Sequence, residues 1–172
     1  MMKKRFLLSL VAMSLFSGAA SAAQSGQINF LGAVSNTTCD LAPSVNGSAN
    51  NQVDLGIAAP NGTGLAVPFS LKATNVQGCT GLTGKTAHVT WQGNLNNVGI
   101  QNVGGSATDA YVSLKTVNGL SSAVQRVTST NPSVDFNTDV LKSDGMKFTA
   151  QLAAKATEGD FVASTSYAVV YN

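Results

Sequence analysis

The side chains in this chain that could do chemistry are few, and two cysteines stand out among them. Cys39 and Cys79 are the only cysteines, and His88 is the only histidine. Such a thiol pair forms a disulfide, stays as two free thiols or contributes to a metal site. Because a metal site needs further ligands, which a single histidine does not supply, the sequence predicts neither a metal nor another cofactor.

Catalytic patterns are absent from the sequence. No serine lies in a nucleophile-elbow motif, and the single histidine has no recognisable triad around it. The carboxylates are scattered, and Glu158 and Asp160 flank Gly159, where a turn is the expected use. The Gly62-Thr63-Gly64 run lacks the third glycine of a dinucleotide-binding loop. These observations predict that the protein is not an enzyme.

The first 23 residues have the pattern of a secretory signal peptide. Basic residues are followed by a short apolar run and then by small residues, with cleavage expected after Ala22 or Ala23. The apolar run is well short of the roughly 20 residues that a membrane-spanning helix needs. Export delivers the cysteines to an oxidising compartment, so a Cys39–Cys79 disulfide is favoured over free thiols.

The charge of the chain depends on that leader. The formal net charge is +2, with ten Lys and Arg against eight Asp and Glu. Without Lys3, Lys4 and Arg5, seven cationic residues remain against the eight acidic ones, a net charge of −1. The basic character therefore belongs to the leader, and no nucleic-acid partner is predicted.

The elements that must position these residues are β-strands. Apolar and polar residues alternate in short runs separated by turn clusters, which is typical of an all-β, two-sheet sandwich. Residues 27–35 alternate, with Ile28, Phe30, Gly32 and Val34 on one face. The other expected strands are residues 52–57, 65–73, 87–91, 110–117, 146–154 and 164–171.

The strand at residues 165–171 has small or apolar residues on both faces, which predicts burial on both sides. It lies at the end of the chain, so we expect its second neighbour to come from another molecule. The strand at residues 27–35 precedes Cys39 by a few positions and carries an apolar face. It is either an ordinary first strand or a strand intended for another molecule.

Both ends of the chain resemble a known family, the chaperone–usher fimbrial (pilus) subunits. Residues 26–34, followed by Cys39 and then by Cys79 forty positions on, resemble the N-terminal region of these subunits. Gly159 is fourteenth from the C-terminus and Tyr171 is penultimate, which resembles the family's chaperone-recognition pattern. Residues 53–59, 64–72 and 91–93 are also similar to major shaft subunits of animal enterotoxigenic fimbriae.

The resemblance implies an incomplete immunoglobulin-like β-sandwich that lacks its final strand. It divides the chain into a signal peptide (residues 1–23), an N-terminal donor-strand extension (24–35) and the pilin domain (36–172). The subunit would polymerise head to tail with itself by donor-strand exchange. Its other implied partners are a periplasmic chaperone, an outer-membrane usher and a host glycan receptor. The chain would pass through the periplasm to a cell-surface fimbrium and support adhesion.

The resemblance also assigns roles to residues. Ile28, Phe30 and Val34 would fill pockets of a neighbouring subunit, and Gly32 would mark a close backbone approach, or alternatively a β-bulge. The acceptor strand and chaperone contact would comprise Gly159, Phe161, Tyr167, Val169 and Tyr171.

The alternative function is a secreted, monomeric carbohydrate-binding β-sandwich module. Trp91 and Tyr111 could stack on a sugar in a shallow site, although Trp91 on an alternating strand also fits core packing. A free-standing module should fold without help, whereas an incomplete sandwich should require a donated strand.

Overall fold

A computed structural model describes residues 39–172, which form ten β-strands and two short 3-10 helices. The strands are β1 (Leu41–Val45), β2 (Ser48–Ala49), β3 (Thr63–Ala73), β4 (Thr86–Gly93), β5 (Ile100–Gln101), β6 (Tyr111–Thr116), β7 (Arg126–Val127), β8 (Ser133–Asn137), β9 (Met146–Ala153) and β10 (Thr165–Tyr171). The helices are η1 (Val76–Leu82) and η2 (Thr138–Lys142). The all-β prediction is confirmed.

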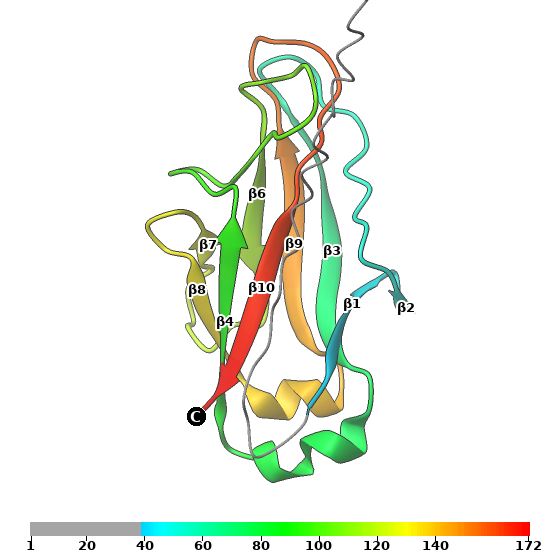
Figure 1. The fold of residues 1–172 in the computed structure, drawn as a ribbon, viewed down its shortest axis with the longest axis vertical. Coiled ribbons are helices and arrows are strands. Elements are labelled where there is room, and N and C mark those ends of the chain that lie inside the picture. Colours follow the sequence, from blue (N-terminus) through cyan, green and yellow to red (C-terminus); the bar gives the residue numbers. More distant parts are fainter. Residues whose placement is uncertain (1–38) are drawn as a thin grey trace, which may run out of the picture. The chain divides into compact units, whose positions relative to one another are not determined.

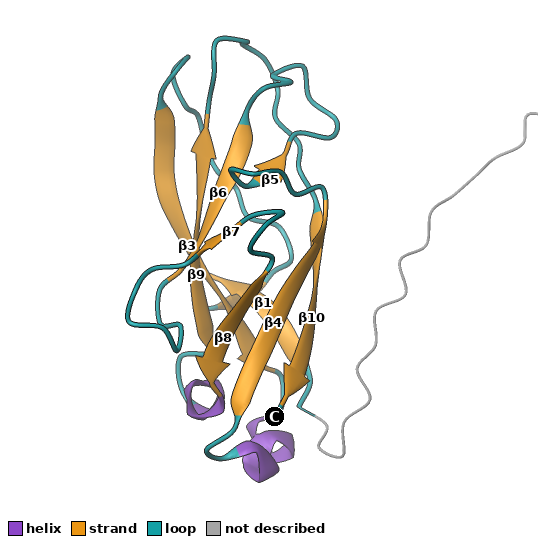
Figure 2. Ribbon diagram, turned by 90° about the vertical axis from the view of Figure 1, so that its left-hand side faces the viewer, coloured by secondary structure: helices purple, strands orange, loops and turns teal. Residues whose placement is uncertain are grey.

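The strands of residues 39–172 form two antiparallel sheets (Figure 1, Figure 2). The larger sheet has the order β2-β1-β3-β9-β6-β5, and β7 also pairs with β6. The smaller sheet has the order β10-β4-β8. The two sheets share one apolar core, which makes the fold an immunoglobulin-like β-sandwich.

The core follows from the alternation of side chains along the strands. In β9, Met146, Phe148 and Ala150 are buried, whereas Lys147 and Thr149 between them face outward. An aromatic cluster fills the centre, with Phe148 within 5.5 Å (ring centroids) of Phe69, Trp91 and Phe136. Two of these rings come from each sheet, so the cluster joins the sheets. Burial of each such side chain contributes about 1.5–3 kcal/mol to stability.

The predicted disulfide is present. Cys39, just before β1, is bonded to Cys79 in η1, with 4.7 Å between their Cα atoms. Both cysteines are buried, Cys79 almost completely. The bond ties the start of the domain to the connection between β3 and β4.

Three local expectations differ from the structure. Residues 52–57 were expected to form a strand, but they belong to no sheet, and Gly56 has a positive φ of 64°. The strands β1 and β8 were not expected, because each has only five residues and β1 contains Pro43. The strand β10 was expected to be buried on both faces, but Val170 is 55% exposed, so only the face with Val169 packs on the core.

Several predictions concern residues outside the described part of the chain. These are the signal peptide (1–23), the donor extension (24–35) and its face of Ile28, Phe30, Gly32 and Val34. Neither short helix in residues 39–172 has the length and apolar character needed to cross a membrane.

Removing the disulfide should destabilise the mature subunit by roughly 4 kcal/mol on the chain-entropy account, because Cys39 and Cys79 are separated by 40 positions. The free energy of unfolding, measured in urea with and without dithiothreitol, should fall by this amount on reduction. The Cys39→Ser, Cys79→Ser double variant should already have the lower value and should not respond to the reductant. A change below about 1 kcal/mol would contradict the expected contribution.

Candidate functional site

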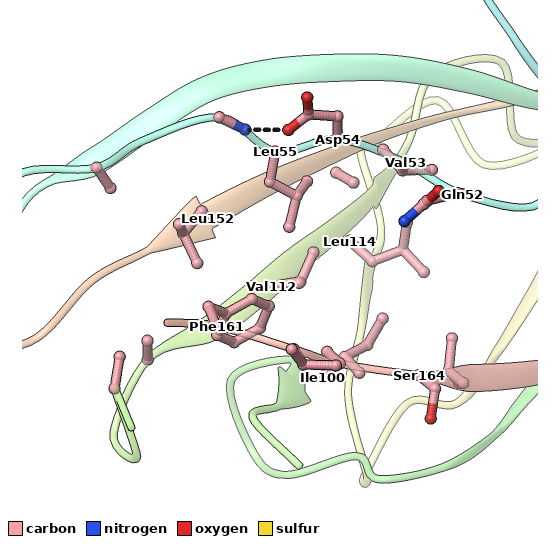
Figure 3. Close-up of a pocket in the computed structure, with 18 of the residues that line it drawn as sticks. Gln52, Val53, Asp54, Leu55, Ile100, Val112, Leu114, Leu152, Phe161 and Ser164 are labelled. Carbon is pink, nitrogen blue, oxygen red and sulfur yellow. Dashed lines mark hydrogen bonds between the residues drawn. The ribbon is translucent and has the colours of Figure 1, made fainter. Parts of the chain in front are cut away.

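The main concave feature of residues 39–172 is an apolar groove of about 1630 Å³. It lies between the two sheets, where the edge strand β10 and residues 50–60 face each other without a strand between them. Figure 3 shows Leu55 and Phe161 on opposite sides, with Leu152, Val112 and Leu114 between their levels. The floor is formed by Phe69, Leu71, Trp91, Ile100, Val112, Leu114, Ala150 and Leu152.

Both walls of the groove have free backbone groups. Within residues 39–172, β10 pairs with β4 on one side and with no strand on the other. On the opposite wall, residues 51–58 make no backbone–backbone hydrogen bond to the described part of the chain. Two of their N–H groups, those of Gln52 and Gly56, donate to the side chains of Asn50 and Asp54. Val53 and Leu55 in this wall pack against the core, whereas Ile57 is 94% exposed. A strand placed between the walls could therefore pair with both of them.

The groove has two chemically different ends. We call the residues 102–107 and 159–162 the loop end, where Ala107, Ala110 and Leu152 form a small second core. Toward the other end, the aromatic rings of Phe69, Trp91 and Tyr167 line the groove. The loop end is therefore lined by Phe161 and small residues, and the other part is lined by aromatic rings.

Tyrosines bridge the two sheets beyond the aromatic part of the groove, at what we call the disulfide end. The Tyr167 hydroxyl donates to the Leu41 carbonyl oxygen at 3.4 Å, and the Tyr171 hydroxyl donates to the Cys39 carbonyl oxygen at 3.3 Å. Burial raises the pKa of Tyr171 to about 12, with smaller contributions from Asp40 and Tyr167. Burial also raises the pKa of Tyr167. These hydroxyls bind Cys39 and the first residue of β1, Leu41, to β10.

Gly159 occupies a position that only glycine fits. Its φ is +137°, and a Cβ there would lie 1.9 Å from Ser106 Oγ and 3.2 Å from the Ala107 backbone nitrogen. The Ser106 hydroxyl accepts a hydrogen bond from the Asp160 backbone N–H at 3.2 Å. The absence of a side chain at Gly159 therefore lets residues 159–162 contact the 102–107 loop.

The predicted acceptor residues divide into two groups. Gly159, Phe161 and Tyr167 line the groove, whereas Val169 and Tyr171 lie beyond its lining residues. Val169 is buried in the core, and Tyr171 is half-buried against Cys39. Residues 159–171 are therefore one continuous segment along the groove and its disulfide end, as Figure 1 shows for β10 and the loop before it.

Sequence reasoning missed the rest of the lining. Val53 and Leu55 carried a signal, because the alternation at 52–57 placed them on one face. Ile100, Val112 and Leu152 carried no signal beyond their apolar character, because only the sheet order brings β5, β6 and β9 together.

The remaining reactive groups lie elsewhere. His88 Nδ1 is 2.6 Å from Asp135 Oδ1, and both side chains are partly exposed on paired strands of the smaller sheet. Within residues 39–172, no group of three or more His, Cys, Asp or Glu side chains could hold a metal ion. The apolar groove is therefore the feature that points to function.

Together, the fold and the groove define a class: an immunoglobulin-like β-sandwich that is open along one strand edge and can accept a strand. The chain is 46% identical over 171 residues to the F107 fimbrial protein of Escherichia coli, which covers 99% of each chain. It is also 34% identical over 121 residues to the K99 fimbrial protein of Escherichia coli, covering 68% of this chain and 66% of that protein. No protein-family model matches the sequence.

The chain belongs to this family of fimbrial proteins, and it is a structural subunit that polymerises into a fimbria at the cell surface. The resemblance to subunits of animal enterotoxigenic fimbriae is thereby confirmed.

Gly159→Ala should destabilise the subunit by about 1–3 kcal/mol, because the added Cβ would meet Ser106 Oγ and the backbone would remain at a φ that alanine rarely adopts. Gly104→Ala is the matched control in the same contact, since its Cβ would lie 3.5 Å from Val162. Urea unfolding should show a lower free energy of unfolding for Gly159→Ala and an unchanged value for Gly104→Ala. Equal free energies of unfolding for the two variants would show that the close approach of Gly159 to Ser106 does not contribute to stability.

The tyrosines at the disulfide end should make stability fall at high pH. Because the folded state raises the pKa of Tyr171 from 10.0 to about 12, its contribution is complete below pH 10 and is lost as the pH rises through about 12. The free energy of unfolding of the wild type should decline over this window. The free energy of unfolding of Tyr171→Phe should decline less over this window, and that of the Tyr167→Phe, Tyr171→Phe double variant should decline least. Parallel curves for the three proteins would contradict this role of the tyrosines.

Proposed function

We propose that the groove of one subunit receives the N-terminal extension (residues 24–35) of a neighbouring subunit as its missing strand. The observation that carries this proposal is the pair of free backbone edges on either side of an apolar floor. Backbone hydrogen bonds would supply affinity, and side chains on one face of the donated strand would supply the register. Ile28, Phe30 and Val34 would enter the groove, with Gly32 at a point where the backbones approach closely.

The positions of the chain ends support one direction for the donated strand. Tyr171, at the end of β10, is hydrogen-bonded to Cys39, so the donor extension leaves its own domain at the disulfide end. In a head-to-tail fibre this end of one subunit faces the loop end of the next. The extension would enter at the loop end with Val34 first along the groove and Ile28 deeper, which makes it antiparallel to β10.

Polymerisation follows from the same geometry. The donated strand and the groove are different surfaces of one subunit, so each contact leaves one free groove and one free extension. Such a head-to-tail contact does not close into a dimer and instead extends into a filament.

An empty groove exposes apolar side chains and unpaired strand edges, which favour aggregation. We therefore infer the export route that the family resemblance implies. Residues 1–23 direct the chain to the periplasm, a periplasmic chaperone covers the groove of residues 36–172, and an outer-membrane usher exchanges the chaperone for the next subunit's extension.

The proposal assigns the protein a structural role and no catalytic step, in agreement with its fimbrial relatives. The alternative, a free-standing sugar-binding module, was based on Trp91 and Tyr111, and the Tyr111 ring lies 5.8 Å from Lys155 Nζ. The stacking role of Trp91 requires that it be accessible. That side chain is 5% exposed and packs against Phe148 and Tyr167, which favours core packing over sugar stacking. No specific observation in residues 39–172 favours a glycan receptor site, so the proposal is restricted to assembly.

A peptide of residues 24–35, added to the subunit in complex with its chaperone, should displace the chaperone and complete the sandwich. Peptide binding should raise the free energy of unfolding of the subunit by about 4 kcal/mol when the free peptide concentration is a thousand times its Kd for the subunit. Chaperone release on a sizing column and thermal unfolding would measure the two effects.

The controls use the same peptide. Gly32→Leu should block insertion by placing a side chain where the backbones must approach closely, and Phe30→Asp should block it by bringing a charge to the apolar floor. Leu31→Ala, on the other face, should have little effect. If the unmodified peptide neither released the chaperone nor raised the unfolding temperature, the donor-strand proposal would be wrong.

A further inference from the structure

We propose that Asn102 is the positioning residue that shapes the loop end of the groove and thereby selects the side chain of donor residue 34. This inference rests on the proposed function, because it concerns the same groove. Asn102 itself is absent from the residues that line the groove, so it would act through the segment that it holds, residues 160–162.

The side-chain amide of Asn102 makes an unusually complete set of hydrogen bonds. Its Oδ1 accepts from the backbone N–H groups of Gly104 (3.2 Å), Gly105 (2.9 Å) and Val162 (3.2 Å). Its Nδ2 donates to the carbonyl oxygens of Gly105 (2.9 Å) and Ala107 (2.7 Å). One partly buried side chain therefore both folds the 102–107 loop and joins it to the segment before β10.

Further contacts hold the 102–107 loop and residues 160–162 close together. The Val103 N–H donates to the Val162 carbonyl oxygen (2.7 Å), and the Ala107 N–H donates to the Asp160 carbonyl oxygen (3.0 Å). A Cβ on Gly105 would lie 1.9 Å from the Asp160 carbonyl oxygen, so the backbones touch directly.

Phe161 lies between these fixed neighbours, and its position is the functional consequence. Its side chain points into the groove, as Figure 3 shows, and packs with Ala107, Ala110 and Leu152. Because Asp160 and Val162 are both held by the 102–107 loop, the ring of Phe161 has a fixed place at the loop end. The size of the space between Phe161 and Leu55 on the opposite wall therefore depends on Asn102.

The direction of the donated strand identifies the side chain that meets this space. A strand entering from the loop end and running antiparallel to β10 places Val34 there and Ile28 toward the aromatic part of the groove. Loss of the Asn102 bonds should thus relax selectivity for residue 34 and leave selectivity for residue 28 unchanged.

The test is a competition between donor peptides for the chaperone-bound subunit. Wild-type subunit receives an equimolar mixture of the peptide 24–35 and its Val34→Ala variant, and mass spectrometry measures the captured ratio. We expect a preference of about tenfold or more for valine, as for the loss of one apolar group from a fitted pocket. With Asn102→Ala the ratio should fall below about twofold, whereas the preference for Ile28 over its alanine variant should stay the same.

Asn118→Ala is the matched control. Asn118 also joins two segments, by accepting from the Lys147 N–H (2.7 Å) and donating to the Gly145 carbonyl oxygen (3.0 Å), but it does not line the groove. It should lower stability without changing either peptide ratio. A role of Asn102 in general stability alone would likewise leave both ratios unchanged, and that outcome would overturn the inference.

Two further measurements keep the inference testable if Asn102→Ala does not fold. Asn102→Asp keeps an acceptor for the three N–H groups but places a carboxylate oxygen against the Gly105 and Ala107 carbonyls, so it should lose the residue-34 preference as well. In the peptide-bound wild type, hydrogen exchange at the Val162 amide should be slowed at least about a hundredfold relative to an unstructured amide. Rapid exchange there would refute the inference, whereas failure of wild-type subunit to capture any peptide would refute the proposed function instead.

Discussion

The fold depends on one constraint, which is that a strand edge next to an apolar floor must be paired. Within residues 39–172, β10 has a partner on one side only, and the free side borders the floor of the groove. An ordinary edge strand satisfies its backbone groups with water, but water at this edge would also contact the partly exposed side chains of Leu55, Phe69 and Phe161. One added strand along the groove would therefore both cover the floor and pair the edge, which is the role proposed for the extension of a neighbouring subunit.

The two ends of the groove are held by different kinds of interaction. At the disulfide end, the Cys39–Cys79 bond fixes the segment just before β1, and the hydroxyl of Tyr171 joins Cys39 to β10. At the loop end, the contacts are hydrogen bonds between backbone groups and the Asn102 amide. In the proposed assembly, the covalently fixed end is where the chain's own extension would leave. The end without a covalent link is where a neighbour's extension would arrive, and adjustment there does not disturb the attachment point.

The sequence predicted the fold class and the long strands because alternation reports which side chains are buried. It therefore identified β3, β9 and β10. Alternation does not report hydrogen bonding, so residues 52–57 were expected to belong to a sheet although they lie outside one. The floor of the groove was out of reach for another reason. Ile100 and Leu152 are distant in sequence, and only the order of the strands brings them together.

The C-terminal pattern singled out Gly159 and Tyr171 as residues for partner recognition, yet both also have a role inside the subunit. Gly159 permits the close contact with Ser106, and the hydroxyl of Tyr171 binds the Cys39 carbonyl. These contacts lie at the two ends of one segment that carries Phe161 and Tyr167 into the groove between them. The residues that prepare the groove for a partner are thus the residues that fold its ends. In the proposed assembly, the contacts that fold residues 159–171 would therefore also shape the surface that receives the donated strand.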